Sequence, residues 1–161
     1  MARARRASVT GARADAPALP APPRDADETA LRAYGERLGA ALRAPAVVTL
    51  TGDLGSGKTT LAQAIARGAG VRGDVTSPTF ALVHEYHAPS HRVYHIDLYR
   101  LRNASELANL GWDEIVSSDG IVLIEWPERA HGALPVPRLD VTLGEVAGSP
   151  DRRTIDARWV R

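Results

Sequence analysis

Residues 52–60 read "GDLGSGKTT", and this stretch decides the fold that the sequence predicts. Lys58 is the only lysine of the chain, since every other member of the lysine and arginine count of 20 is an arginine. A composition this biased keeps lysine where its shape matters as well as its charge. Gly52, Gly57, Lys58 and Thr59 complete the pattern G-x-x-x-x-G-K-[ST], which predicts a phosphate-binding loop.

The residues on either side supply the structural context that this motif requires. The apolar run at 46–51, "AVVTLT", predicts a buried strand, and 58–70, "KTTLAQAIARGAG", predicts a helix closed by glycine. Glycines let successive backbone N–H groups point into one concavity, and the helix N-terminus adds positive potential there. Lys58 would reach the β- and γ-phosphates as a compact point charge, and the Thr59 hydroxyl would ligate Mg²⁺.

Periodicity and turn signals predict the remaining elements. Asp25 and Glu28 resemble a capping box at the start of a first helix. Two apolar runs around a turn predict a hairpin, and two runs near the C-terminus predict another. The expected elements are a helix beginning near residue 25, a hairpin within 80–101, a short helix at 103–112, a buried strand at 120–126, and a terminal hairpin of 138–146 and 152–160.

The composition describes one globular domain and excludes several other classes. The chain has 161 residues, a net charge of +1 and no cysteine, which excludes a disulfide framework or a cysteine-ligated metal site. No apolar run approaches the roughly 20 residues of a membrane span, so we expect no membrane contact and a cytoplasmic location. Residues 1–24 are rich in Arg, Ala and Pro and predict a disordered tail before a single domain at 25–161. This acid-poor start leaves an organelle transit peptide as the alternative.

Two carboxylates stand where apolar runs end. Asp97 follows "VYHI" and Glu125 follows "IVLI". A phosphate-binding loop needs a carboxylate near Mg²⁺ and a side chain that positions the attacking group, and these two residues are the candidates. The alternative is that each carboxylate only caps a strand end or pairs with an arginine.

Polar and aromatic side chains near the predicted hairpin have two interpretations each. Thr76, Ser77 and Thr79 in "TSPTF" would contact the γ-phosphate as a switch segment, or form a plain turn. Trp126 either belongs to the core or stacks on a base. Histidines flank the hairpin without a tight H-x-x-x-H pair, which disfavours a histidine metal site; they are His84, His87, His91 and His95.

The four segments "GDLGSGKTT", "SPTF", "YHIDLYRL" and "IEWPE", in this order, resemble the TsaE family from about Asp27 to the end of the chain. Members of that family are bacterial P-loop ATPases required for the threonylcarbamoyladenosine (t⁶A) modification of tRNA at position 37. The resemblance implies an α/β fold, a P-loop NTPase-like three-layer sandwich with a small mixed β-sheet. It also implies a Mg²⁺-dependent ATPase, weak alone and activated in complex, that acts with TsaB and TsaD and meets tRNA only through them.

The resemblance implies a role for each matching position. Glu125 would join Thr59 at Mg²⁺, and Lys58, Asp97 and Thr79 would serve catalysis. The positions expected to bind ATP are Gly52, Asp53, Leu54, Gly55, Ser56, Gly57, Lys58, Thr59, Thr60, Asp97, Trp126, Arg129 and Thr29.

Two other functions use the same loop. A small-molecule kinase would also need an acceptor pocket and usually a lid, but the chain passes from the predicted P-loop helix almost directly into the hairpin. A nucleotide-gated interaction module would hydrolyse ATP negligibly. A phosphorylated metabolite in place of free phosphate would identify the kinase, and comparing hydrolysis alone and with TsaB–TsaD would separate the module.

Overall fold

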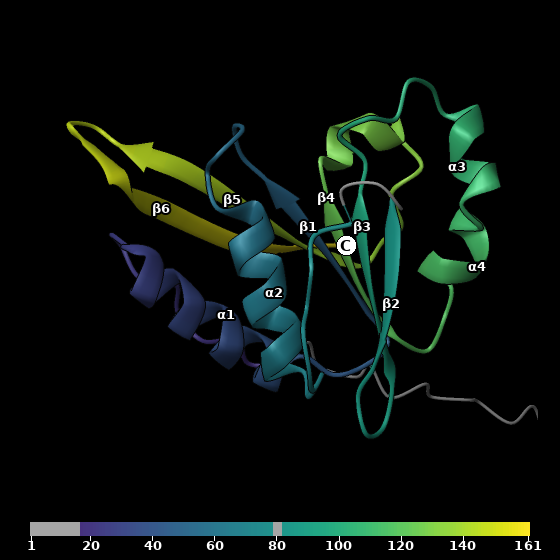
Figure 1. Ribbon diagram of the computed structural model, residues 1–161, viewed down its shortest axis with the longest axis horizontal. Coiled ribbons are helices and arrows are strands. Elements are labelled where there is room, and N and C mark those ends of the chain that lie inside the picture. Colours follow the sequence, from purple (N-terminus) through teal and green to yellow (C-terminus); the bar gives the residue numbers. More distant parts are fainter. Residues whose placement is uncertain (1–16, 79–81) are drawn as a thin grey trace, which may run out of the picture.

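One mixed six-stranded sheet with helices on both faces forms the protein (Figure 1). The computed structural model describes residues 17–78 and 82–161. The strands lie in the order β2-β3-β4-β1-β5-β6. Their bounds are β1 Ala46–Thr51, β2 Val83–His87, β3 Arg92–Asp97, β4 Ile121–Glu125, β5 Arg138–Val146 and β6 Ser149–Val160. The helices are α1 Glu28–Ala41, α2 Lys58–Gly68, α3 Ser105–Asn109, α4 Trp112–Val116 and the 3₁₀ helix η1 Pro127–Ala130.

The four central strands run parallel, and one antiparallel strand lies at each edge. The strands β3, β4, β1 and β5 pair in parallel, while β2 pairs with β3 and β6 with β5 in antiparallel fashion. Parallel strands end at the same edge of a sheet, so the segments that follow β1, β3 and β4 meet there. Glu125 at the end of β4 lies in register with Asp97 of β3 on one side and Leu50 of β1 on the other.

Alternation along the strands divides the core into two layers. Val48 and Leu50 of β1 belong to the cluster that packs with Ile65 of α2, while Val47 belongs to the cluster that contains Trp112 of α4. The helices α1 and α2 therefore cover one face of the sheet, and α3 and α4 cover the other (Figure 1). Full burial of each such Leu or Ile contributes about 1.5–3 kcal/mol. The predicted α/β three-layer fold is confirmed.

The predicted strands and the P-loop helix are confirmed, but the first helix begins differently. Asp27, and not Asp25, is the N-cap residue of α1: its Oδ1 accepts a hydrogen bond from the Ala30 N–H at 2.8 Å. Because a cap must stand directly before the first helical residue, Asp25 lies too early in the chain. Asp25 instead pairs with Arg152 of β6.

The short helix expected within 103–112 is α3, and a second short helix that the pattern did not predict, α4, follows it. Gly111 adopts a left-handed backbone with φ of 72°, which interrupts helical propagation between α3 and α4. The sequence pattern "NASELANLGW" places Gly111 as a helix end, and the chain then starts a new turn at Trp112. The indole Nε1–H of Trp112 donates to the carbonyl of Ala133, which fixes α4 to the segment after η1.

Part of the predicted N-terminal tail falls within the described residues. Residues 17–23 form no helix or strand, and Leu19 packs against the core cluster of α1 and α2. Ala26 then pairs with Arg153 of β6 as an isolated antiparallel bridge. The division into a tail at 1–24 and a domain at 25–161 stays a prediction. Within the part of the chain that the structure describes, no helix has the length and apolar character needed to cross a membrane.

The contact between α1 and α2 is close enough to require glycine. A Cβ atom on Gly39 of α1 would lie 2.0 Å from the Ile65 carbonyl oxygen and 2.8 Å from the Ala69 nitrogen of the facing segment. Gly68 of α2 faces the Glu36 carbonyl in the same way, at 2.0 Å. Backbone atoms cannot yield as a flexible side chain can, so the helices would have to move apart to accept a methyl group.

We therefore predict that Gly39→Ala destabilises the fold although it raises helix propensity. Propensity alone would favour the variant by about 1 kcal/mol, whereas forced separation of packed helices costs about 1–3 kcal/mol or more. Urea denaturation should show a net loss in the free energy of unfolding. Ala33→Gly, on the exposed side of the same helix, is the matched control and should cost about 1 kcal/mol from propensity alone. A stabilised Gly39→Ala protein would contradict the close crossing.

Candidate functional site

The loop between β1 and α2 is shaped by its glycines. Gly55 and Gly57 adopt φ angles of 78° and 101°, which side chains with a Cβ rarely accept. A Cβ on Gly52 would lie 2.5 Å from Ser56 Oγ and 2.9 Å from the Leu143 carbonyl oxygen of β5. The predicted phosphate loop therefore has the tight turn and the following helix that its pattern requires.

Lys58, the first residue of α2, turns back into this loop. Its Nζ donates to the carbonyl oxygens of Gly52 at 2.6 Å and Asp53 at 2.8 Å, and it lies 4.1 Å from the centroid of the Trp126 ring. Burial lowers the pKa of Lys58 below its ordinary value, and the nearby Glu125 partly opposes this shift. The ammonium is thus held in a desolvated cradle of oxygens and one aromatic face.

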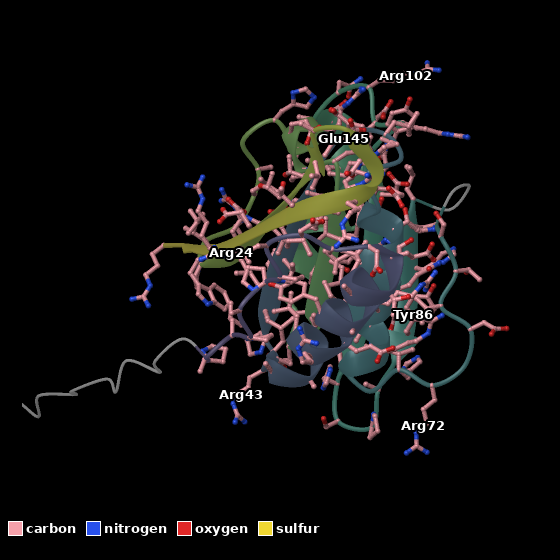
Figure 2. All side chains as sticks on the ribbon, turned by 90° about the vertical axis from the view of Figure 1, so that its left-hand side faces the viewer. Arg24, Arg43, Arg72, Tyr86, Arg102 and Glu145 are labelled. Atoms are coloured by element: carbon pink, nitrogen blue, oxygen red, sulfur yellow. The ribbon has the colours of Figure 1, made fainter. Side chains whose placement is uncertain are left out.

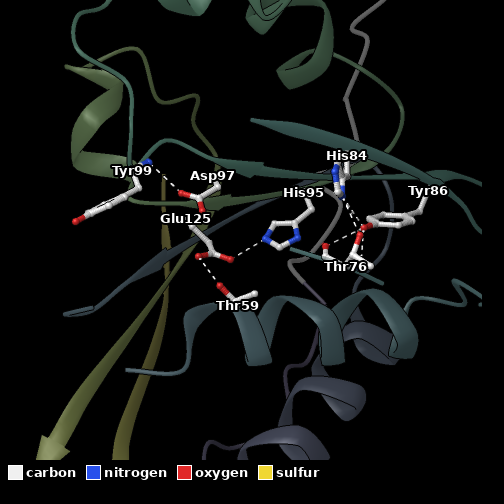
Figure 3. Close-up of polar contacts among 8 residues, drawn as sticks. All are labelled: Thr59, Thr76, His84, Tyr86, His95, Asp97, Tyr99 and Glu125. Atoms are coloured by element: carbon white, nitrogen blue, oxygen red, sulfur yellow. Dashed lines mark hydrogen bonds and ion pairs between the residues drawn. The ribbon is translucent and has the colours of Figure 1, made fainter. Parts of the chain in front are cut away.

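Glu125 connects α2 to the buried interior of the sheet (Figure 3). One carboxylate oxygen, Oε2, accepts from the Thr59 hydroxyl at 3.0 Å, and the other, Oε1, lies 2.7 Å from Nε2 of His95. Both His95 and Glu125 are buried. With Glu125 ionised, Nε2 carries the proton and donates, and Nδ1 of His95 has no partner among the described residues. The histidine therefore fixes the carboxylate that faces Thr59.

Asp97 lies beside Glu125 at the same edge of the sheet (Figure 3). Its Oδ1 accepts from the Tyr99 backbone N–H at 2.9 Å. Burial raises the pKa of Asp97 above the ordinary value, and the negative charge of Glu125 raises it further. Both carboxylates line one cavity but differ in their partners, so they suit different roles: Glu125 is held on both oxygens by side chains, while Asp97 is held on Oδ1 by a backbone N–H.

The donor set at Thr59 and Glu125 fits Mg²⁺. A hydroxyl and a carboxylate are the hard oxygen ligands that this ion accepts, and it usually takes its other ligands from phosphates and water. Across residues 17–78 and 82–161, no group of three or more His, Asp or Glu side chains could hold a metal ion unaided.

Thr76, which follows α2 in the chain, is held by the hydroxyl of Tyr86 (Figure 3). This oxygen accepts from the Thr76 N–H at 3.1 Å and donates to the Thr76 carbonyl at 3.0 Å, while Nδ1 of His84 lies 3.0 Å away. The next two residues, Ser77 and Pro78, then line the same cavity as Lys58. Thr79, predicted as catalytic, lies outside the described residues.

Two cavities of about 440 Å³ each open on the loop. The first, which we call the phosphate-side cavity, contains Lys58, Asp97, Glu125 and Trp126 in its wall. The second, the helix-side cavity, lies between the start of α1, the loop and β6. The two share the wall residues Gly55, Gly57 and Thr60. One elongated ligand could therefore occupy both.

Some of the remaining predicted site residues line these cavities, and Arg129 does not. Thr29 lines the helix-side cavity, and Leu54, 74% exposed, lies at the rim of the phosphate-side cavity. Trp126 is half-buried with a left-handed φ of 57°, and its ring contacts Tyr99 as well as Lys58. Such backbone strain on a bulky residue is characteristic of functional sites.

Arg129 lines neither cavity, and its guanidinium donates to the Leu101 carbonyl.

Three residues of the site are absent from the sequence-based prediction: His95 as the partner of Glu125, Tyr86, and Arg153. His95 could have been found, because residues two apart on a strand share a face and Asp97 was already a candidate. Tyr86 contacts Thr76 ten residues earlier, and Arg153 contacts the carbonyl oxygens of Gly55 and Ser56 from 98 and 97 residues later in the chain; no sequence pattern marks either contact.

Comparison with known proteins places this geometry in a family. The family model described as "Threonylcarbamoyl adenosine biosynthesis protein TsaE" matches residues 25–155. The chain is similar to the tRNA threonylcarbamoyladenosine biosynthesis protein TsaE of Haemophilus influenzae, with 47% identity over 55% of this chain and 56% of that protein. The TsaE of Mycobacterium bovis is 40% identical over 79% of this chain and 80% of its own length. The crystal structure of Bacillus subtilis YdiB is similar with a TM-score of 0.64 and 32% identity, covering 81% of this chain and 78% of that one.

The buried ammonium predicts a specific pH dependence of stability. Because burial lowers the pKa of Lys58 in the folded chain below its ordinary 10.5, the unfolded chain binds more protons between the two values. Wild-type stability therefore rises with pH across that window, while Lys58→Met lacks this contribution. In urea denaturation at a series of pH values, the difference in unfolding free energy should move in favour of the wild type as the pH approaches 10.5. Parallel pH profiles for the two proteins would contradict the desolvated cradle.

Proposed function

The chain belongs to the TsaE family, and on this basis we propose that it is an ATP-binding and ATP-hydrolysing subunit required for t⁶A modification of tRNA. The family model covers residues 25–155, which includes every element of the sheet except the end of β6. The observation that carries the nucleotide part of the proposal is the hydrogen bond from Thr59 to Glu125 beside the ammonium of Lys58. These three groups supply a metal-side hydroxyl, a carboxylate and a phosphate-binding cation at one loop.

In the proposed complex the phosphates lie over the loop of residues 52–60. Lys58 exchanges the carbonyl oxygens of Gly52 and Asp53 for phosphate oxygens, while the N-terminus of α2 supplies backbone donors. The nucleoside extends into the helix-side cavity, where Thr29 and the other residues at the start of α1 lie. The shared wall residues of the two cavities support this path for one continuous ligand.

Thr59 and Glu125 would hold Mg²⁺, which neutralises charge that develops on the phosphates during transfer to water. His95 keeps Glu125 in place through its 2.7 Å contact, so the carboxylate does not need to reorganise when the ion arrives. Asp97 would orient the attacking water, and its raised pKa suits a group that accepts a proton from that water. Ser77 and Pro78 would lie near the terminal phosphate as the switch segment.

We propose that tRNA reaches this subunit only through TsaB and TsaD. Binding of nucleic acid without partners needs several clustered cations, but the net charge is +1. Figure 2 shows that Arg24, Arg43, Arg72 and Arg102 point away from widely separated parts of the surface. In this proposal ATP controls how the subunit docks on its partners, and hydrolysis is weak in the isolated protein and faster in the complex.

The two carboxylates can be separated by magnesium titration. ATP binding would be followed through the fluorescence of Trp126, whose ring faces Lys58. Glu125→Gln should raise the Mg²⁺ concentration needed for half-maximal binding by about tenfold or more, since it removes an anionic ligand. Asp97→Asn should leave that concentration nearly unchanged and lower the release of free phosphate by roughly 100-fold. The reverse pattern would mean that their roles are exchanged, and a phosphorylated metabolite in place of free phosphate would identify a kinase.

The cellular role is tested in the host by depletion. Loss of the protein should reduce t⁶A in tRNA, as measured by mass spectrometry of tRNA nucleosides. The wild-type gene should restore t⁶A, and Lys58→Ala should not, because one lost phosphate contact costs about 100-fold or more in rate. Arg43→Ala, a change on the surface away from both cavities, is the control that should restore t⁶A fully. Unchanged t⁶A after depletion would refute the cellular role and leave the ATPase proposal standing.

A further inference from the structure

Arg153 of β6 holds the outer side of the phosphate loop. Its Nε–H donates to the Ser56 carbonyl at 3.0 Å, and its Nη2 donates to the Gly55 carbonyl at 3.1 Å. Two donors on one rigid guanidinium plane therefore hold two successive carbonyls of the loop. Arg153 stands about 100 positions later in the sequence than the loop that it contacts, and it also lines the helix-side cavity.

These contacts set the direction of the backbone groups that a phosphate would meet. In a trans peptide the C=O and the next N–H point in opposite directions. A Ser56 carbonyl held outward by Arg153 therefore turns the Gly57 N–H toward the opposite side of the loop, at the start of α2. The preceding N–H, that of Ser56, is already bonded to the Asp53 carbonyl at 3.0 Å, so the loop is tied from within and from outside.

Arg153 is itself fixed by its surroundings. Its Nη1 donates to the carbonyls of Pro150 at 2.5 Å and Arg152 at 2.8 Å, within its own strand. Its backbone N–H and C=O pair with Ala26 at 2.8 and 2.9 Å, directly before the Asp27 cap of α1. The terminal hairpin, the start of α1 and the phosphate loop therefore meet at one side chain.

We infer that Arg153 is a positioning residue that holds the phosphate loop in its nucleotide-binding shape, and that the terminal hairpin is thereby part of the nucleotide site. The inference rests on the proposed binding of a nucleotide at this loop. It assigns to Arg153 the planar, two-point grip on Gly55 and Ser56, beyond the contribution of its positive charge. Nucleotide affinity then depends on the hairpin as well as on the loop motif.

The neighbouring arginine provides a matched control. Arg152 lies on the same strand but pairs with the exposed Asp25 and does not contact the loop in any of its hydrogen bonds that the structure describes. The experiment compares wild type, Arg152→Ala, Arg153→Ala and Arg153→Lys, the last of which keeps the charge and loses the fork. ADP affinity is measured by titration calorimetry, and hydrogen exchange of the peptide at 52–60 is measured in the nucleotide-free proteins.

We expect both Arg153 variants to bind ADP roughly tenfold or more weakly, because about 1.4 kcal/mol, the scale of one such charge-assisted hydrogen bond, is a factor of ten. The loop peptide should exchange faster in both, while peptides of the central strands stay protected. Arg152→Ala should match the wild type in both measurements. If Arg153→Ala does not fold, Arg153→Lys with wild-type protection of the central strands decides the question.

The outcomes that overturn the inference are separate from those that overturn the proposed function. Wild-type ADP affinity in Arg153→Lys would show that charge alone suffices, and an equal loss in Arg152→Ala would show a general effect of the hairpin; either refutes the positioning role. Loop exchange unchanged in both Arg153 variants would refute it without any nucleotide. A wild-type protein that binds no ADP would instead refute the proposed nucleotide function.

Discussion

The parallel pairing of β3, β4 and β1 is the constraint on which the candidate site depends. It brings the ends of three strands to one edge, so that Asp97, Glu125 and the loop after Thr51 become neighbours although they are far apart in sequence. Side-chain hydrogen bonds then refine this arrangement, since Glu125 contacts both His95 and Thr59. A register shift of one residue would turn Glu125 to the other face of the sheet and separate it from α2.

The close packing of α1 on α2 also shapes the candidate site, from the face of the sheet that these two helices cover. Gly39 and Gly68 let the two helices approach until backbone atoms nearly touch, which places the start of α1 beside the loop that begins α2. The start of α1 and this loop both contribute walls of the helix-side cavity.

Local signals in the sequence predict most of the fold. The glycine pattern of residues 52–60, the apolar runs and the turns predict the strands, the P-loop helix and the position of both carboxylates at strand ends. The sequence-based predictions fail where a single residue, or a contact between residues distant in the sequence, determines the structure. Asp27 replaces Asp25 as the cap because a cap is defined by a single position, and α4, which starts directly after the predicted helix end at Gly111, was not predicted. Arg153 could not be predicted, because its partners are carbonyl oxygens that no sequence pattern marks.

The contacts of Lys58 change how ligand binding at this loop must be understood. Its ammonium already has two carbonyl oxygens at 2.6 and 2.8 Å and an aromatic face at 4.1 Å. A phosphate that binds here therefore competes with the protein's own carbonyl oxygens for the ammonium. The free energy gained from Lys58 on binding is the difference between the two sets of contacts. The loop carbonyls act as an internal competitor, which favours a readily reversible complex. In the proposed ATPase, release of the nucleotide on every turn would benefit from this balance.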